Sequence, residues 1–378
     1  MPNFAPLSKE EKEFLESRFD KMYSFVEQIG AGSFSNVYKG YMKKSKGEKK
    51  HVKKKENPTL AIKVLKPSNH PKRVQTEIEI LELADGLGNI SELLMYHMEP
   101  DGHCAIVMVY FENKAFESYY DRLNLCQIKW YATSLLRALA YLQKLNVIHR
   151  DVKPANFLFN PVTGEGRLID FGLSELNREQ PAKLQKDVLA NHCRCINEPT
   201  YCSKCARKPK QQVDRGGTAG FRAPEILMKY PNYDGQIDVY AAGVCMLSIV
   251  TRRYPFFPKA DDMDSLAMMA QVLGWGQLKE AAKAMDKTLD TNMKPEVVDF
   301  DELVKTLRIN SYPPEDGYEE AESGIYSSEG SESPAPTDDT NSLEWFSAVN
   351  LLKGLLNPNP HKRLRPAEAL QHDFITGS

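Results

Sequence analysis

The segment "VIHRDVKPANFLF" (residues 147–159) places three polar groups at fixed spacing between two apolar runs. Asp151 and Asn156 are five residues apart, and Lys153 lies between them. Phosphoryl transfer needs a carboxylate to accept the hydroxyl proton, a cation near the transferred phosphate and an amide oxygen on magnesium. A chance occurrence of these residue types in this order is very improbable, so the segment predicts a phosphoryl-transfer site.

Two further segments follow in the order that this chemistry requires. "LIDFGLSE" (168–175) supplies Asp170, a carboxylate that can bind Mg²⁺ and so neutralise charge on phosphate oxygens. "FRAPE" (221–225) ends the region, and its Glu225 is expected to be structural, paired with Arg363 in "PHKRLRP".

Upstream, "IGAGSFSNV" (29–37) lies between two strand-like runs. Small residues let backbone N–H groups lie over phosphate oxygens, although a glycine pair between strands is more often an ordinary turn. Ser35 stands at the third position of the usual glycine pattern, which makes the loop stiffer.

Lys63 is the one polar residue in the apolar strand "LAIKVL". It is either a surface lysine or an ammonium that reaches the α- and β-phosphates, and the second role needs a carboxylate to orient it. Glu77, on the helix that follows, can supply that carboxylate.

Composition indicates an ordinary globular protein. The 378 residues are 42% hydrophobic and 26% charged, with a net charge of −2, which does not favour nucleic-acid binding. The first residues, "MPNFAPLSKEEKEFLE", contain no apolar core of a secretory signal. The longest apolar run, 239–250, is too short to span a bilayer and predicts a buried helix.

The hydrophobic period changes along the chain from two to about 3.6. A helix capped by Ser8 and Glu11, with Phe14, Leu15 and Phe19 on its apolar side, is expected first. Residues 23–42 predict a hairpin, and 59–66 and 103–111 predict strands. Helices are predicted at 70–84, 130–146, 238–250, 343–356 and 365–374, and the acidic tract 312–341 is expected to be disordered.

Together, the ordered motifs resemble the eukaryotic protein kinase family over residues 23–375, and Lys153 with Thr218 resembles its serine/threonine branch. The resemblance implies an α+β, bilobal fold with a small β-rich lobe that carries one key helix and a larger helical lobe. We expect a helical extension at 1–22, the small lobe and hinge at 23–112, and the large lobe at 113–378. Two inserts are expected in the large lobe, at 173–215 and 275–342.

The resemblance also implies roles for individual residues. The catalytic set would be Asp151, Lys153, Asn156, Asp170, Lys63 and Glu77. ATP would be bound by Ile29, Gly30, Gly32, Ser33, Val37, Ala61, Lys63, Met108, Tyr110 and Leu158, with Met108 as the gatekeeper before the hinge. Mg²⁺ would be held by Asn156 and Asp170.

Four cysteines cluster inside the first insert, in "HCRCINEPTYCSKC" (192–205). Thiolates of Cys193, Cys195, Cys202 and Cys205 can surround Zn²⁺ tetrahedrally, and with no open position the site would be structural. Four reduced surface thiols or a redox pair are the alternatives, and His192 could replace one cysteine as a ligand. The three other cysteines are scattered, which is a poor disulfide framework and favours a reducing compartment.

A cysteine cluster just before "RGGTAGFRAPE" resembles one kinase family, the replication-origin kinases of the cell-division-cycle-seven family. "RRYPFFPKADDMDSLAMMAQVLG" (252–274) agrees with it. The resemblance implies a nuclear Ser/Thr kinase that depends on a DBF-four-type regulatory subunit and phosphorylates the MCM replicative helicase at acidic-flanked sites. The zinc site would then be a docking scaffold for that subunit, because metal binding can fold a loop with few apolar residues.

Two other functions stay open: another Ser/Thr kinase with an incidental zinc insert, which a regulatory subunit would not activate, and a pseudokinase scaffold, against which the intact catalytic set argues. The lysine-rich segment 43–57 predicts a solvated loop, with nuclear import as the rival interpretation.

Overall fold

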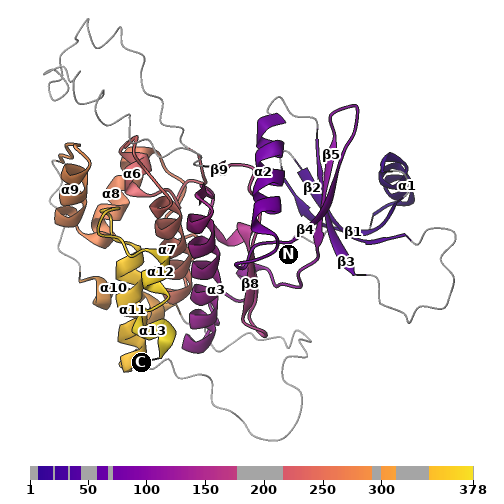
Figure 1. The fold of residues 1–378 in the computed structure, drawn as a ribbon. Coiled ribbons are helices and arrows are strands. Elements are labelled where there is room, and N and C mark those ends of the chain that lie inside the picture. The colour runs from indigo at the N-terminus through magenta and orange to yellow at the C-terminus, as the bar shows by residue number, and fades with distance from the viewer. Residues whose placement is uncertain are drawn as a thin grey trace, which may run out of the picture.

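The computed structural model describes residues 7–19, 22–32, 35–43, 58–66, 71–176, 216–291, 299–311 and 340–377. A small lobe built on one sheet lies beside a larger helical lobe, and helix α2 (Pro71–Ala84) stands between the sheet and the large lobe (Figure 1). The α+β, two-lobed fold is therefore as predicted. Among the described residues, no helix is both long and apolar enough to cross a membrane.

The small lobe is a five-stranded antiparallel sheet in the order β1-β2-β3-β5-β4. Its strands are β1 (Tyr23–Ala31), β2 (Ser35–Met42), β3 (Thr59–Leu65), β4 (Leu93–Met98) and β5 (Cys104–Val109). The predicted hairpin at 23–42 is confirmed as β1 and β2, and the central strand β3 pairs with both β2 and β5.

Helix α1 (Lys9–Arg18) covers one face of this sheet. The predicted capping box is present, because the Ser8 side chain accepts from the N–H of Glu11 while the Glu11 carboxylate accepts from the N–H of Ser8. Leu15 and Phe19 are buried with apolar residues of β1, β2, β3 and β5. The expectation that Phe14 belongs to this apolar side was wrong, since its side chain is 59% exposed and lies under the guanidinium of Arg18.

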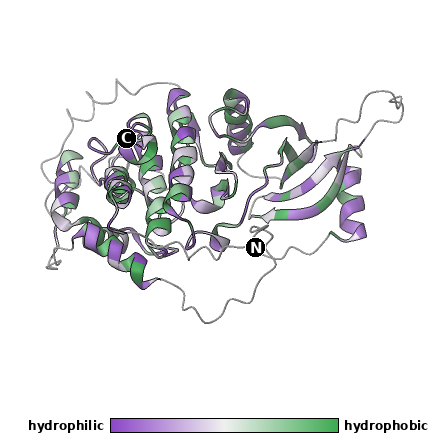
Figure 2. Cartoon of the chain, turned by 90° about the horizontal axis from the view of Figure 1, so that it is seen from below, coloured by the Kyte–Doolittle hydropathy of each residue, from purple (hydrophilic) through white to green (hydrophobic). Residues whose placement is uncertain are grey.

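The large lobe packs its helices around α7 (Gln236–Val250), in which every residue is buried, as the apolar run predicted. The other helices are α3 (Leu125–Lys144), α6 (Pro224–Leu227), α8 (Asp262–Leu273), α9 (Trp275–Ala284), α10 (Phe300–Asn310), α11 (Leu343–Leu355), α12 (Pro366–Ala369) and α13 (Asp373–Thr376). Hydrophobic and hydrophilic residues alternate along the helices and strands, as expected for elements with one buried side (Figure 2).

Short elements at the inner edge of the large lobe carry the candidate site. These are the 3-10 turns η1 (Phe116–Ser118) and η2 (Pro154–Asn156) and the strands β6 (Val147–Ile148), β7 (Phe157–Asn160), β8 (Glu165–Leu168) and β9 (Glu175–Leu176). β7 pairs with β8, and β6 pairs with β9. Residues 149–156, the candidate catalytic loop, therefore lie between two small sheets.

The predicted single helix at 365–374 was wrong, because two short helices occupy this range. Pro366 begins α12, and the ring of His372 accepts from the N–H of Phe374 and so starts α13 anew. Helices α9 and α10 lie within the predicted insert 275–342, whereas the acidic residues 312–339 lie outside the described residues.

Glu225 at the start of α6 forms the ion pair that the sequence predicted. Arg363 donates to its two carboxylate oxygens at 2.7 and 2.9 Å, and both side chains are at most 1% exposed. Arg363 also donates to the carbonyls of Asn357 and Gln236. The pair therefore joins the end of the activation segment, which runs from Asp170 to Glu225, to the loop before α12.

Replacing Arg363 with methionine (R363M) is expected to lower the free energy of unfolding of the large lobe by about 3–5 kcal/mol, because it leaves a buried carboxylate without its partner. Denaturant unfolding followed by fluorescence measures this loss. The exposed neighbour Lys362 provides a matched control, K362M, whose stability should stay near wild type. Equal stability of R363M and K362M would contradict the structural role of the pair.

Candidate active site

Lys63 lies in the middle of β3, where it pairs with Ile106 of β5, and its side chain is 9% exposed. Its ammonium donates to Glu77 Oε1 on α2 at 2.5 Å and to Asp170 Oδ1 at 2.8 Å. The prediction that Glu77 orients this lysine is confirmed. The same contacts exclude a surface-pointing lysine, and they join the small lobe to Asp170 on the large lobe.

Lys63 and Asp170 stabilise each other's charged forms, whereas burial and the nearby Asp170 carboxylate raise the pKa of Glu77. Burial would lower the pKa of Lys63, but attraction by Glu77 and then by Asp170 outweighs it and raises that pKa above its ordinary value. For Asp170, burial acts to raise the pKa, and the Lys63 ammonium more than offsets this and lowers it. The lysine is thus a fixed cation and Asp170 a fixed anion at neutral pH.

Asp151 sits at the centre of a second hydrogen-bonded cluster on the catalytic loop. Its Oδ2 accepts from Lys153 Nζ at 2.8 Å and from Asn156 Nδ2 at 3.1 Å. Its Oδ1 accepts from both the hydroxyl and the backbone N–H of Thr218, at 2.7 and 2.9 Å. Lys153 also donates to the Thr218 hydroxyl at 2.8 Å. The residues predicted from spacing at 151, 153 and 156 are therefore in direct contact.

The contact with Thr218 has a chemical meaning. A hydroxyl donating to Asp151 at 2.7 Å stands in the relation that a substrate hydroxyl needs to its general base. Lys153 contacts both that hydroxyl and the carboxylate, so it supplies the cation near the reacting oxygen. This arrangement can accept a hydroxyl proton while a phosphoryl group is transferred.

A buried carboxylate that the sequence analysis missed holds the catalytic loop in place. Asp238, in the first turn of α7, accepts the backbone N–H groups of His149 and Arg150 at 2.7 and 2.8 Å. Burial raises its pKa to about 7 even though these N–H groups act to lower it. A lone carboxylate at the start of an otherwise apolar run was the signal that could have identified it.

Such anchoring is needed because the backbone is strained in two neighbouring segments, the catalytic loop and the segment that carries Asp170. Arg150 and Asp170 adopt φ values of 68° and 66°, in the left-handed region that side chains with a Cβ rarely occupy. His149 ties the two segments together, since its Nε2 lies 3.0 Å from the carbonyl of Ile169. Burial lowers the pKa of His149, so its ring is neutral and serves as a structural link.

The glycine-rich turn between β1 and β2 lies on the same lobe as Lys63. β1 carries Ile29 and Gly30, and Gly30 pairs with Val37 of β2. The N–H of Gly32 donates to the first carbonyl of β2 at 2.8 Å, which closes the turn. The backbone therefore doubles back at the position where N–H groups would meet phosphate oxygens.

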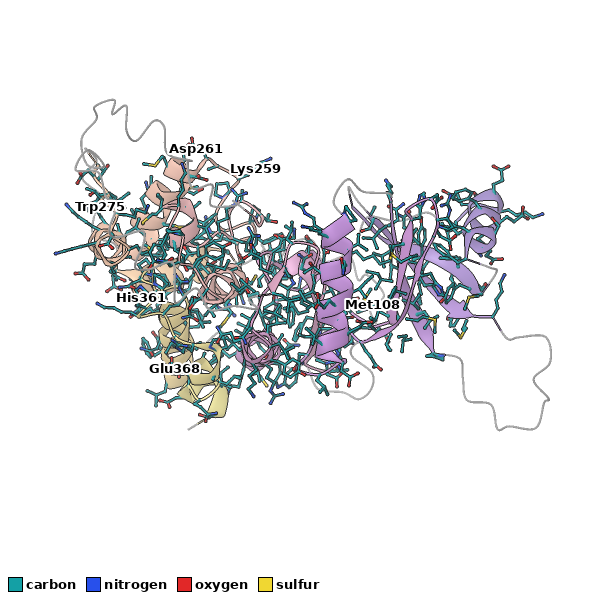
Figure 3. All side chains as sticks on the ribbon, turned by 45° about the horizontal axis from the view of Figure 1, so that its top comes forward. Met108, Lys259, Asp261, Trp275, His361 and Glu368 are labelled. Atoms are coloured by element: carbon teal, nitrogen blue, oxygen red, sulfur yellow. The ribbon has the colours of Figure 1, made fainter. Side chains whose placement is uncertain are left out.

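Residues expected around the adenine come from both lobes. Ala61 on β3 pairs with Met108 on β5, and the N–H of Tyr110 donates to the carbonyl of Thr59 at 3.0 Å. Met108 is 8% exposed and lies beside α2 at the boundary between the lobes (Figure 3). Leu158 lies on β7 of the large lobe. Met108 thus stands one residue before the end of β5, where the chain leaves the sheet for the large lobe.

Asn156 and Asp170 can hold Mg²⁺ by their oxygens. The Asn156 amide nitrogen donates to Asp151, which leaves the amide oxygen for a metal, and Asp170 uses one carboxylate oxygen on Lys63. Two oxygen ligands suit Mg²⁺, which retains waters and binds phosphates besides. Bound there, the ion would neutralise charge on the phosphate oxygens.

Some predicted positions lie outside the described residues. These are Ser33 of the glycine-rich turn and the four cysteines at 193, 195, 202 and 205. Within the ranges that the structure describes, no group of three or more His, Cys, Asp or Glu side chains could hold a metal ion. Cys104 and Cys245 are buried free thiols, and Cys126 is an exposed one.

Comparison with known proteins agrees with this geometry. Residues 23–375 match the protein kinase domain family. The cell cycle serine/threonine-protein kinase hsk1 of Schizosaccharomyces pombe is 29% identical, over 93% of this chain and 72% of its own length. The probable cell division control protein 7 homolog 2 of Encephalitozoon cuniculi is 32% identical, over 82% of this chain and 90% of its own length. The cell division cycle 7-related protein kinase of Homo sapiens is 24% identical, over 77% and 72%.

Changing Asp151 to asparagine (D151N) is expected to lower kcat for phosphoryl transfer by roughly 10²–10⁴, because the general base is lost. ATP affinity should stay nearly unchanged, since the glycine-rich turn, Lys63 and Asp170 keep their contacts. Turnover is measured with radiolabelled ATP and affinity with a fluorescent nucleotide. D286N, at an exposed position of the large lobe, is the matched control. Near-wild-type turnover of D151N would remove Asp151 from the mechanism.

Proposed function

This chain belongs to the protein kinase family and, within it, to the cell-division-cycle-seven serine/threonine kinases; we propose that it is the catalytic subunit of a two-chain kinase that phosphorylates the MCM replicative helicase. The enzyme transfers the γ-phosphate of ATP to a serine or threonine hydroxyl. Asp151 accepts the hydroxyl proton, Lys153 and Lys63 neutralise phosphate charge, and Asn156 and Asp170 would hold Mg²⁺, which would neutralise further charge on the phosphates.

One observation carries the proposed preference for acidic-flanked substrates. A small cavity beside Asp151 and Thr218 is lined by Arg222, whose Nη2 donates to the carbonyl of Gly217 at 2.9 Å. The Arg222 Nε is buried, and among the described residues it has no hydrogen-bond acceptor. A guanidinium next to the general base suits a carboxylate or phosphate on the substrate.

The small lobe offers a face on which a regulatory subunit could dock. β4 is the edge strand of the sheet, and its alternate side chains Leu94, Tyr96 and Met98 are 39–59% exposed. On the adjacent helix α2, Leu83 is 47% exposed. A partner that covers these residues would also hold α2, and therefore Glu77, in contact with Lys63. This supports a regulatory subunit that acts through the ion pair.

The remaining parts of the proposal rest on the sequence. Structural Zn²⁺ would be bound by Cys193, Cys195, Cys202 and Cys205 and would stiffen the insert for partner docking. The kinase would act in the nucleus, in DNA replication, as the family resemblance implies. The lysine-rich segment is consistent with nuclear import.

The function is tested with the purified chain, alone and co-expressed with its regulatory subunit, on MCM tail peptides that carry a serine beside glutamate or beside glutamine. The complex should be much more active than the lone chain and should prefer the glutamate peptide. R222M should lower kcat/KM on that peptide by about 10- to 100-fold, because hydrogen bonds to charged groups contribute about 1.5–3 kcal/mol. Its activity on the glutamine peptide should change little.

R253M is the control, since Arg253 is exposed. Equal activity with and without the subunit would favour the alternative, a partner-independent Ser/Thr kinase with an incidental insert. Equal losses of R222M on both peptides would remove Arg222 from acid recognition while leaving the kinase activity in place.

The zinc site is tested by metal content. The purified chain should carry about one Zn²⁺, and the double variant C202S/C205S should lose it, because neutral hydroxyls are poor zinc ligands beside thiolates. Partner-stimulated activity should then fall much more than ATP affinity. C126S, which changes an exposed free thiol on α3, is the control. A wild-type chain without zinc, or a double variant that binds its subunit normally, refutes the docking scaffold.

A further inference from the structure

The guanidinium of Arg150, directly before the general base, is neutralised by a carboxylate of the chain itself. Arg150 Nη1 donates to Glu175 Oε1 at 2.6 Å, and the Arg150 side chain is only 7% exposed. The hydroxyl of Tyr233 lies within hydrogen-bond distance of both oxygens of Glu175, at 3.2 and 3.1 Å. The carboxylate therefore contacts two side chains from different segments of the large lobe.

These contacts bring three segments together at one point. Arg150 belongs to the catalytic loop, Glu175 opens β9 after "DFGLS", and Tyr233 precedes α7. Backbone pairing also brings Glu175 close to the catalytic loop, since Ile148 of β6 pairs with Glu175 of β9. The first residues of the activation segment are thus held against the catalytic loop by a sheet pair and by an ion pair.

The end of the activation segment also packs on Arg150. A Cβ added to Gly216 would lie 2.5 Å from Arg150 Nη2, and one added to Gly217 would lie 2.5 Å from the Arg150 carbonyl. At Gly217, whose φ is +90° and whose close neighbour is backbone, only glycine lets the chain pass this near to Arg150. The position of Arg150 therefore limits where the backbone before Thr218 can lie. Thr218 contacts Asp151 through its N–H and hydroxyl.

A buried guanidinium in this place needs an anion. Arginine stays charged at all physiological pH values, and an unpaired charge out of water is costly. In many kinases the anion is added covalently, because phosphorylation of the activation segment creates a new pair between phosphate and arginine that orders the segment. Here a carboxylate at the start of that segment already pairs with Arg150 Nη1.

We propose that Glu175 is a positioning residue for Asp151: it provides the anion that Arg150 needs, so this kinase orders its catalytic loop without phosphorylation of the activation segment. The proposal rests on the kinase activity but not on the identity of the substrate or partner. Glu175 does not touch the reacting atoms. It acts through Arg150, which shares its backbone anchor, Asp238, with His149.

The first test compares E175Q with wild type as the complex with the regulatory subunit. Glutamine keeps the size and hydrogen-bonding capacity but removes the charge. kcat should fall by roughly 10- to 100-fold, since a misplacement of about 1 Å at a catalytic group can cost that much. KM for ATP should change little, because Lys63, Glu77 and Asp170 form a separate cluster. E165Q, an exposed carboxylate on β8, is the matched control.

A double-mutant cycle separates positioning from general stability. R150M alone should lower kcat about as much as E175Q, and R150M/E175Q should be no worse than R150M, because the two side chains act as one unit. Multiplicative losses in the double variant, or E175Q with wild-type kcat, would overturn the proposal. The kcat of every variant is divided by the kcat of wild type on the same peptide. A wrong substrate or partner would lower both values by the same factor and leave this ratio unchanged.

The second test needs no variant and decides the matter even if E175Q does not fold. The wild-type complex is treated with phosphatase until mass spectrometry finds no phosphate between residues 171 and 225. Its kcat should match that of the untreated complex. A large loss of kcat that returns after rephosphorylation of this segment would show that phosphate, not Glu175, is the activating anion.

Discussion

The catalytic loop depends on a carboxylate that is buried in the most apolar helix of the protein. Asp238 in α7 accepts two successive N–H groups of the loop, those of His149 and Arg150, and these two bonds fix the backbone directly before the general base, Asp151. The anchor is rigid because α7 is packed on all sides. It can therefore hold Arg150 at a positive φ that an isolated loop would leave. Every contact of Asp151 described above builds on this fixed backbone.

A second constraint links the lobes through charge. Lys63 comes from the central strand of the small lobe, Glu77 from α2, and Asp170 from the large lobe, yet all three meet within hydrogen-bond distance. The side chains of Lys63 and Glu77 are buried and that of Asp170 is 47% exposed, so movement of α2 away from the sheet would leave the buried ammonium paired with Asp170 alone. The ion pair thereby makes the position of the Lys63 ammonium depend on the placement of α2.

The activation segment is fastened at both ends by ion pairs of different character. Near its start, Glu175 is 40% exposed and meets a buried arginine, so the pair can be exchanged or reached by other groups. At its end, Glu225 and Arg363 are fully buried, with further bonds from Arg363 to backbone carbonyls. The first pair sets the geometry of the catalytic loop, whereas the second holds the segment to the body of the lobe.

The sequence by itself determined the chemistry and the order of the elements. The spacing of Asp151, Lys153 and Asn156 lies within one short loop, and the periodic runs predicted β1, β2, β3, β5, α2, α3 and α7, because these signals are local. The edge strand β4 was not predicted. What only the tertiary structure decided are contacts between residues distant in sequence: Asp238 beneath the catalytic loop, Thr218 on Asp151, and Glu175 on Arg150. The break between α12 and α13 has a local cause, since a side-chain cap from His372 to the N–H of Phe374 outweighed the helical pattern. Periodicity reports which face of a segment is buried, but the partner that a buried charge meets is set by packing of the whole chain.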